Sequence, residues 1–214
     1  MKLLKYLLLS CLLAFTGMTT GASAEPRLDK DYRLITPAQP TETGDKIEVI
    51  EFFYYGCPHC FDLEPYLKRW KSSMPKDVAF RLVPVVFRDS WVPLTRTFYT
   101  LEALGELARL HNEVFEAIHL KNINLNNEQT LFDWAEKYGV DRKKFADAYE
   151  SFAVRNRVVN ARTLTLAYGM ENTPSLVVDG KYLTGPGLTG SHESAIKVLD
   201  ELIAKAREAR ASKR

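Results

Sequence analysis

The stretch IEVIEFFYYGCPHC, residues 47–60, decides how the rest of the chain is interpreted. Residues 47–55 are mostly β-branched or aromatic, which indicates a central strand covered on both faces. Gly56 ends this strand, and apolar residues then recur at helical spacing over residues 57–74. A second strand is expected over residues 78–87, so the chain begins with a βαβ unit, whose connection is right-handed.

Helical spacing dominates the middle of the chain, and strand signals return only near its end. Apolar residues recur at threes and fours over residues 94–118. A helix over residues 130–138 is expected to open with a Thr-x-x-Asp cap, and another starts at Asp141 and carries Phe152. A strand over residues 175–178, an Asp-Gly hairpin turn, a short strand and a final amphipathic helix follow. This order predicts one α/β domain interrupted by an all-helical insertion.

Residues 1–24 have the features of a secretory signal peptide. Two lysines precede an apolar stretch over residues 6–15, and small residues end at Ala24. The apolar stretch is too short to span a bilayer. Cleavage before Glu25 would remove two of the 29 basic residues and leave 27 against 27 acids. This balance does not favour nucleic-acid binding or a polybasic membrane anchor.

The chain has three cysteines, and the first of them, Cys11, lies in the predicted signal peptide. We interpret Cys11 as an apolar filler that is discarded with this segment, and a lipid-modified protein starting at Cys11 is the alternative. Only Cys57 and Cys60 then remain. An exported protein with one such pair can form a single intramolecular disulfide.

A Cys-x-x-Cys pair can bind a metal, form a static disulfide or exchange electrons. Structural zinc usually needs four ligands, and the four histidines of the chain provide no second pair at the usual spacing. We therefore expect no metal site. A static disulfide across so short a loop would give little entropic stabilisation.

The position of the pair favours redox chemistry. Cys57 is expected at a helix N-terminus, where free backbone N–H groups and the helix dipole stabilise a thiolate. Pro58 suits the first helical turn, and His59 can add a positive charge or a donor beside the sulfur. Cys60 should lie one turn deeper as the shielded partner.

Strand, CPHC and helix, together with the inserted helical block and the signal peptide, resemble the DsbA family of the thioredoxin superfamily. The resemblance covers about residues 26–210. It implies a thioredoxin fold with a mixed central sheet, formed by residues 25–87 and 162–214, and an inserted helical domain over residues 88–161. It also implies a thiol:disulfide oxidoreductase that introduces disulfide bonds into exported proteins through a reversible Cys57–Cys60 disulfide, without any other cofactor.

The resemblance assigns roles to three further residues. Thr173 and Pro174 match the cis-proline loop that faces the disulfide, where the backbone of Thr173 could pair with an extended peptide. The best-known members carry valine at the position of Thr173. Glu51 matches a buried acid that could relay a proton for Cys60, and a strand glutamate that reaches the sheet edge is the alternative.

The expected partners are reduced, unfolded exported polypeptides and a quinone-linked membrane oxidase of the DsbB type that reoxidises the pair. The resemblance places the protein in the periplasm, and we expect a monomer that does not bind nucleic acid. A reductase or isomerase on the same fold is the nearest alternative, although such isomerases carry an N-terminal dimerisation domain and only residues 25–46 precede the first strong strand. A peptide-binding chaperone without redox activity is the other alternative.

Overall fold

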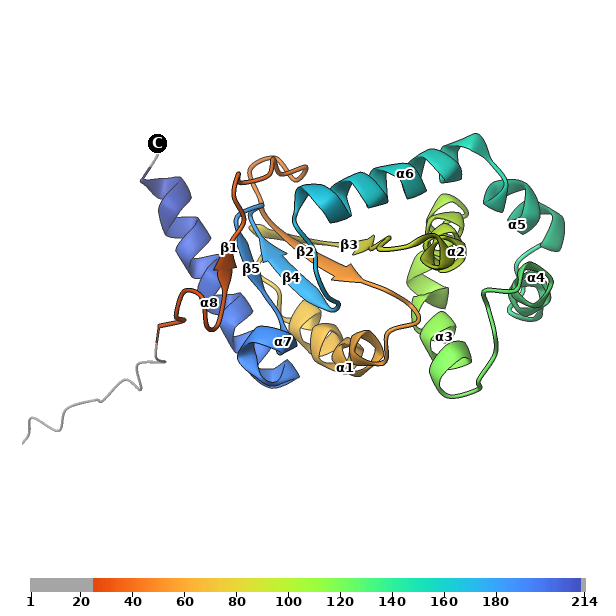
Figure 1. Cartoon of the computed structure of the whole chain (residues 1–214), viewed down its shortest axis with the longest axis horizontal. Helices are drawn as coiled ribbons and strands as arrows, with labels where there is room; N and C mark the ends of the chain where they lie inside the picture. The colour runs from red at the N-terminus through yellow and green to blue at the C-terminus, as the bar shows by residue number, and fades with distance from the viewer. Residues whose placement is uncertain (1–24, 213–214) are drawn as a thin grey trace, which may run out of the picture.

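A five-stranded mixed sheet forms the centre of the protein in the computed structural model, which describes residues 25–212 (Figure 1). Its strands are β1 (Arg33–Leu34), β2 (Ile47–Phe53), β3 (Val78–Pro84), β4 (Ser175–Val178) and β5 (Tyr182–Thr184). The strand order is β1-β5-β4-β2-β3, with β2 and β3 parallel and the other pairs antiparallel. The sheet confirms the predicted βαβ unit and the mixed α/β fold class.

All seven residues of β2 are buried, as expected for a strand covered on both faces. Its side chains alternate between two cores, because successive residues of a strand point to opposite faces. Ile50 and Phe52 belong to the larger core, and Ile47 and Val49 belong to the smaller one. Glu51 therefore points to the same face as Ile47 and Val49.

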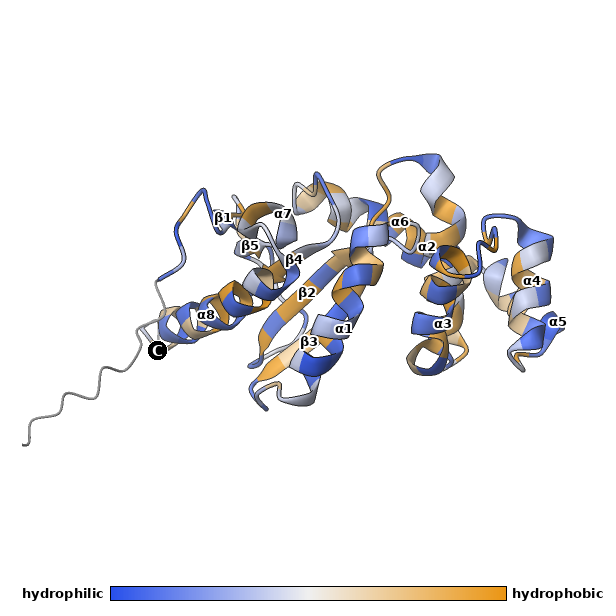
Figure 2. Cartoon of the chain, turned by 90° about the horizontal axis from the view of Figure 1, so that it is seen from below, coloured by the Kyte–Doolittle hydropathy of each residue, from blue (hydrophilic) through white to orange (hydrophobic). Residues whose placement is uncertain are grey.

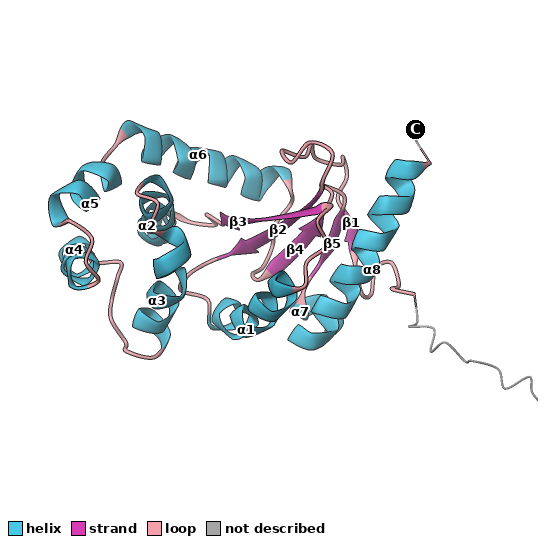
Figure 3. Cartoon of the chain, turned by 180° about the vertical axis from the view of Figure 1, so that it is seen from behind, coloured by secondary structure: helices cyan, strands magenta, loops and turns pink. Residues whose placement is uncertain are grey.

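Helices cover both faces of the sheet (Figure 3). The helices α1 (Pro58–Ser72) and α8 (His192–Ala211) lie on one face, and α6 (Phe152–Ala167) lies on the other. A short helix, α7 (Pro186–Thr189), connects β5 to α8. The apolar residues of α8 face the sheet (Figure 2), and Leu199, Leu202 and Ile203 are buried in the smaller core.

The helical insertion lies between β3 and β4 in the chain, at one end of the sheet (Figure 1). It contains the 3₁₀ helix η1 (Asp89–Trp91) and the helices α2 (Val92–Ala103), α3 (Leu107–His119), α4 (Glu128–Lys137) and α5 (Arg142–Tyr149). The helix α6 leads from the insertion back to the sheet. It continues through residues 161 and 162, so the predicted domain boundary falls inside a helix. The division into domains stays a prediction.

Local turn signals were predicted with mixed success. Asp179 and Gly180 connect β4 to β5, and their φ angles of 55° and 63° match the two positive φ angles of a type I′ hairpin turn. The predicted cap at Thr130 was wrong, because α4 begins earlier and the Asn127 side chain accepts a hydrogen bond from the Thr130 N–H at 3.0 Å. Phe152 lies at the start of α6 and is exposed, so its predicted place on the preceding helix was also wrong.

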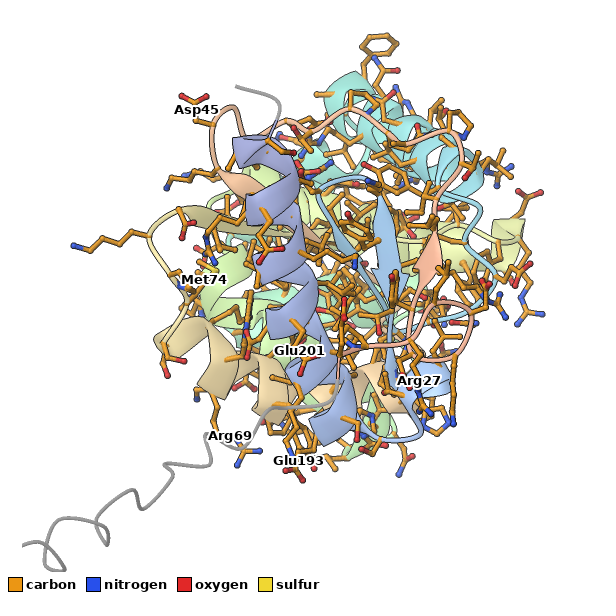
Figure 4. All side chains as sticks on the ribbon, turned by 90° about the vertical axis from the view of Figure 1, so that its left-hand side faces the viewer. Arg27, Asp45, Arg69, Met74, Glu193 and Glu201 are labelled. Atoms are coloured by element: carbon orange, nitrogen blue, oxygen red, sulfur yellow. The ribbon has the colours of Figure 1, made fainter. Side chains whose placement is uncertain are left out.

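The C-terminal end of α8 lies at the opposite end of the molecule from the insertion (Figure 1), next to the loop that carries Asp45 (Figure 4). Arg210 forms an ion pair with Asp179 in the β4–β5 turn and donates to the carbonyl of Asp45 at 2.8 Å. The predicted signal peptide, including Cys11, lies outside the described residues. Within residues 25–212, no helix has both the length and the apolarity needed to cross a bilayer.

Candidate active site

Cys57 lies where the central strand gives way to a helix, as predicted. It is the N-cap of α1, with extended backbone angles, and Pro58 occupies the first helical turn. The Cys57 N–H donates to the carbonyl of Tyr54 at 3.0 Å, which closes a tight turn. Gly56 is required in this turn, because a Cβ atom there would lie 2.5 Å from the ring of Tyr54. The turn therefore presents Cys57 at the free N-terminus of α1.

The two cysteines have opposite environments. Cys57 is partly exposed, whereas Cys60 is fully buried, and both are free thiols. A hydrogen bond with Cys60 is the main cause that lowers the pKa of Cys57 to about 5, and burial opposes it. Burial raises the pKa of Cys60 well above its usual range, and the hydrogen bond with Cys57 adds to this effect. One sulfur is thus prepared as an accessible thiolate and the other as a shielded thiol.

Backbone groups and the loop at Thr173 also act on Cys57. The Thr173 side chain and the backbone N–H groups of Cys60 and His59 lower the pKa of Cys57 further. The Thr173–Pro174 peptide bond is cis, as predicted, and the Thr173 carbonyl lies 3.5 Å from the Cys57 sulfur. This loop therefore faces the cysteine pair.

The side chain of His59 is largely exposed to solvent. Its side chain is 75% exposed, and its Nδ1 atom lies 3.9 Å from a carboxylate oxygen of Asp62. The backbone N–H of His59 acts on Cys57, but a role of the imidazole stays a prediction.

Glu51 is buried in the middle of the sheet beneath α1. It pairs with Leu82 on β3 and with Leu176 on β4, so the sheet-edge alternative is wrong. Both carboxylate oxygens are buried without a hydrogen-bond partner. Burial, and then the charge of Glu64, raises the pKa of Glu51 well above its usual range. The charge of an ionised Glu51 would raise the pKa of Cys60 further.

A groove of about 770 Å³ lies beside Cys57 and was not predicted from the sequence. It is lined by Gly56, Cys57 and Thr173 and by residues of the helical insertion, including Trp91 and Ile118. The ring of Trp91 stacks on Tyr54 with centroids 3.8 Å apart and an interplanar angle of 6°. The aromatic residues were visible in the sequence, but nothing local to Trp91 indicated that it would meet Tyr54.

Fold and site together define a thioredoxin-like protein with a reactive cysteine pair at a strand-to-helix junction, opposite a cis-proline loop. Within residues 25–212, no group of three or more histidine, cysteine or acidic side chains is arranged to hold a metal ion.

Comparisons with known proteins agree with this class. The DSBA-like thioredoxin domain family matches residues 48–195. The chain is 40% identical to the thiol:disulfide interchange protein DsbA of Burkholderia cepacia, over 94% of this chain and 95% of that protein. It is 36% identical to DsbA of Pseudomonas aeruginosa, over 96% and 99%. The structure superimposes on the crystal structure of Pseudomonas aeruginosa DsbA with a TM-score of 0.82 at 37% identity. The aligned region covers 86% of this chain and 96% of the Pseudomonas chain.

The chain therefore belongs to the DsbA family of thioredoxin-fold proteins. It is a protein thiol:disulfide oxidoreductase.

Proposed function

We propose that this oxidoreductase acts as a dithiol oxidase that introduces disulfide bonds into exported polypeptides in the periplasm, after residues 1–24 have been removed. The observation that favours oxidation of the substrate over its reduction is the pKa of Cys57. Hydrogen bonding lowers this pKa to about 5, whereas the pKa of the neighbouring Cys60 thiol is raised. A stabilised Cys57 thiolate stabilises the reduced protein, and a stable reduced form makes the disulfide a strong oxidant.

The exchange takes place in two steps. A substrate thiolate attacks the sulfur of Cys57 in the Cys57–Cys60 disulfide, so the S–S bond breaks, a mixed disulfide forms and Cys60 leaves as a thiolate. A second substrate thiolate then attacks the substrate sulfur of the mixed disulfide and displaces Cys57. The substrate loses two electrons and gains a disulfide, and the protein gains both electrons as a dithiol. Cys57 leaves readily because its thiolate is stabilised.

Glu51 supplies the proton that Cys60 takes up when it leaves. The raised pKa of Cys60 means that this sulfur is a thiol at neutral pH, so a proton must reach a buried position. Burial raises the pKa of Glu51 and so favours its protonated form, which can donate. The position of Glu51 in the central strand beneath α1, with neither carboxylate oxygen hydrogen-bonded, supports a transfer to Cys60, directly or through water.

The substrate is an extended, unfolded segment that lies along the cis-proline loop. The backbone of Thr173, which lines the groove, offers a place to pair like an added strand, and the groove lined by Trp91 and Ile118 receives apolar side chains of the segment. The redox-active pair needs no prosthetic group. A quinone-linked membrane oxidase of the DsbB type then removes the two electrons, and the protein acts as a monomer.

Equilibration with graded mixtures of reduced and oxidised glutathione tests the oxidase assignment. The fraction of Cys57–Cys60 disulfide is read by mass after the free thiols have been alkylated. We expect the pair to stay reduced even in buffers that are rich in oxidised glutathione, as a strong oxidant does. A pair that stays oxidised in reducing buffers would contradict the oxidase and favour a reductase.

Two serine variants separate redox chemistry from peptide binding. Cys57→Ser and Cys60→Ser should each lose oxidation of a reduced, unfolded protein, because neither variant can form the disulfide. When Cys60→Ser is mixed with a protein that carries a disulfide, Cys57 should attack that disulfide and a mixed disulfide should accumulate, because no second thiol resolves it. If Cys57→Ser still promotes folding of the substrate as the unchanged protein does, the protein is a peptide-binding chaperone instead.

A further inference from the structure

Tyr55 is held at both ends by two histidines of the helical insertion. It precedes Cys57 by two positions, and its side chain is buried. Its hydroxyl lies 2.8 Å from Nδ1 of His111, and its carbonyl oxygen lies 2.8 Å from Nε2 of His119. Both histidines belong to α3, so one helix of the insertion contacts the two ends of a residue that leads directly into the active-site turn.

The same two histidines also contact α1 beyond the cysteine pair. The Nε2 atom of His111 lies 3.3 Å from a carboxylate oxygen of Glu64. The ring of His119 stacks on Phe61, with centroids 5.3 Å apart and an interplanar angle of 10°. Figure 1 shows α3 beside the connection between β2 and α1. Contacts from α3 therefore reach the chain both before and after CPHC.

The hydrogen-bond partners of His119 and His111 determine which ring nitrogen donates and which accepts. A carbonyl oxygen only accepts, so Nε2 of His119 carries a hydrogen and donates it to Tyr55. Toward a Glu64 carboxylate, His111 donates from Nε2, and Nδ1 then accepts from the Tyr55 hydroxyl when the ring is neutral. Tyr55 and His111 are buried, so a lost bond would leave a polar group without a partner.

We propose that His119 and His111 are positioning residues of the redox reaction: they hold Tyr55, and through the Tyr55–Gly56 peptide they keep Cys57 at the N-terminus of α1, where its thiolate is stabilised. The inference rests on the thiol:disulfide exchange proposed above. Stabilisation of the thiolate requires its sulfur to stay within reach of Cys60, the Thr173 side chain and the first N–H groups of α1. These groups are useful only while the turn before them is rigid, because hydrogen bonds weaken steeply with distance and angle.

We call the contacts of His111 and His119 with Tyr55 the clamp, and three variants test it on the purified protein. His119→Leu removes the bond to the carbonyl, Tyr55→Phe removes the bond to His111, and His119→Gln keeps an amide N–H donor. We expect His119→Leu and Tyr55→Phe each to raise the pKa of Cys57 and to lower the oxidising equilibrium constant against glutathione by roughly 3- to 10-fold, the effect of one hydrogen bond. His119→Gln should recover part of this loss. The pKa is read from the ultraviolet absorbance of the thiolate.

Leu131→Ala is the matched control, because Leu131 is buried in α4 of the same insertion. It should lower the stability of the protein without changing the pKa of Cys57. The same pKa change in Leu131→Ala, or an equal loss in His119→Gln and His119→Leu, would overturn the clamp. If the pKa of Cys57 is low and neither His119→Leu nor Tyr55→Phe changes it, the clamp is wrong, but the proposed oxidase function is not affected. An ordinary pKa in the unchanged protein would instead contradict the proposed function on which it rests.

Discussion

The backbone carbonyl of Thr173 lies 3.5 Å from the sulfur of Cys57, although the two residues are 116 positions apart in the chain. The carbonyl can accept a hydrogen bond from the thiol but has nothing to donate to the thiolate, so this contact favours the protonated form. The Thr173 side chain acts in the opposite direction and lowers the pKa of Cys57. One residue thus contacts the sulfur in both protonation states.

Thr173→Val should raise the pKa of Cys57, because it removes a hydroxyl that stabilises the thiolate. We expect a rise of about half a unit to one unit, which corresponds to one hydrogen bond. The ultraviolet absorbance of the thiolate against pH measures it. Thr163→Val on the exposed side of α6 is the control and should leave the titration unchanged. An unchanged curve for Thr173→Val would contradict the role of this side chain.

The Cys57 thiolate should contribute increasing stability to the reduced protein as the pH rises from about 5 to about 8.5. The pKa of Cys57 is lower in the folded than in the unfolded state, so its contribution is complete above the unfolded value and disappears as the pH falls through about 5. In the folded state Cys60 stays a thiol across this range because its pKa is raised, and in the unfolded state it begins to ionise only near the upper end, about 8.5. We expect a total gain on the order of 2–4 kcal/mol, which is less than the full shift would give because Cys57 is partly exposed.

Urea unfolding of the reduced protein at several pH values measures this gain, and Cys57→Ser is subtracted to remove the effects of other titrating groups. If the two proteins lose stability in parallel as the pH falls, the Cys57 thiolate does not stabilise the fold.

Glu51→Gln should slow thiol exchange and leave the fold intact. The amide cannot give up a proton to Cys60, so we expect the rate of mixed-disulfide formation to fall by roughly 10-fold or more at neutral pH. The raised pKa of Glu51 also means that the contribution of this one residue becomes increasingly destabilising as the pH rises above about 4.3, the unfolded value. The variant should therefore become progressively more stable than the unchanged protein as the pH increases.

Stopped-flow exchange rates and urea unfolding across pH check both effects of Glu51→Gln. Exchange rates equal to those of the unchanged protein at every pH would remove the proton-relay role.

Trp91→Ala should weaken the use of peptide substrates and spare the chemistry of the cysteine pair. Trp91 lines the groove and stacks on Tyr54, so its loss removes an apolar wall. We expect KM for a cysteine-containing peptide to rise roughly 3- to 30-fold, as for loss of an aromatic anchor. The rate with dithiothreitol should stay the same. Phe152→Ala, an exposed aromatic on α6, is the control, and an equal effect in both variants would rule out a specific groove.

Asn127→Ala should destabilise the insertion by about 1 kcal/mol, the usual effect of losing a helix N-cap. Its side chain accepts from the Thr130 N–H at 3.0 Å and from the Thr130 hydroxyl at 3.0 Å. Thr130→Val keeps the backbone N–H and loses only the second, exposed bond, so it should have a smaller effect. Thermal unfolding of both variants shows which of them loses more stability. A larger loss of stability in Thr130→Val than in Asn127→Ala would indicate that Thr130 is the N-cap after all.

Features encoded by neighbouring residues could be predicted from the sequence. The placement of Cys57 and Cys60 at a strand-to-helix junction follows from an apolar strand, Gly56 and Pro58, which are adjacent in the chain. The Asp179-Gly180 turn was predicted for the same reason, because two residues that accept positive φ angles determine it. Predictions from neighbouring residues failed at Thr130, where Asn127 three positions earlier is also a good N-cap residue and begins the helix instead.

Contacts between distant segments were decided only by the tertiary structure. The resemblance suggested a buried Glu51, but only the packed sheet shows both of its oxygens without a partner. The groove at Trp91 and the contacts of His111 and His119 with Tyr55 depend on how the insertion docks against the sheet. The sequence around a single histidine or tryptophan does not indicate which distant residue its side chain will contact. Strand order and helix packing determine these contacts, because they bring side chains from distant parts of the chain together in the same core.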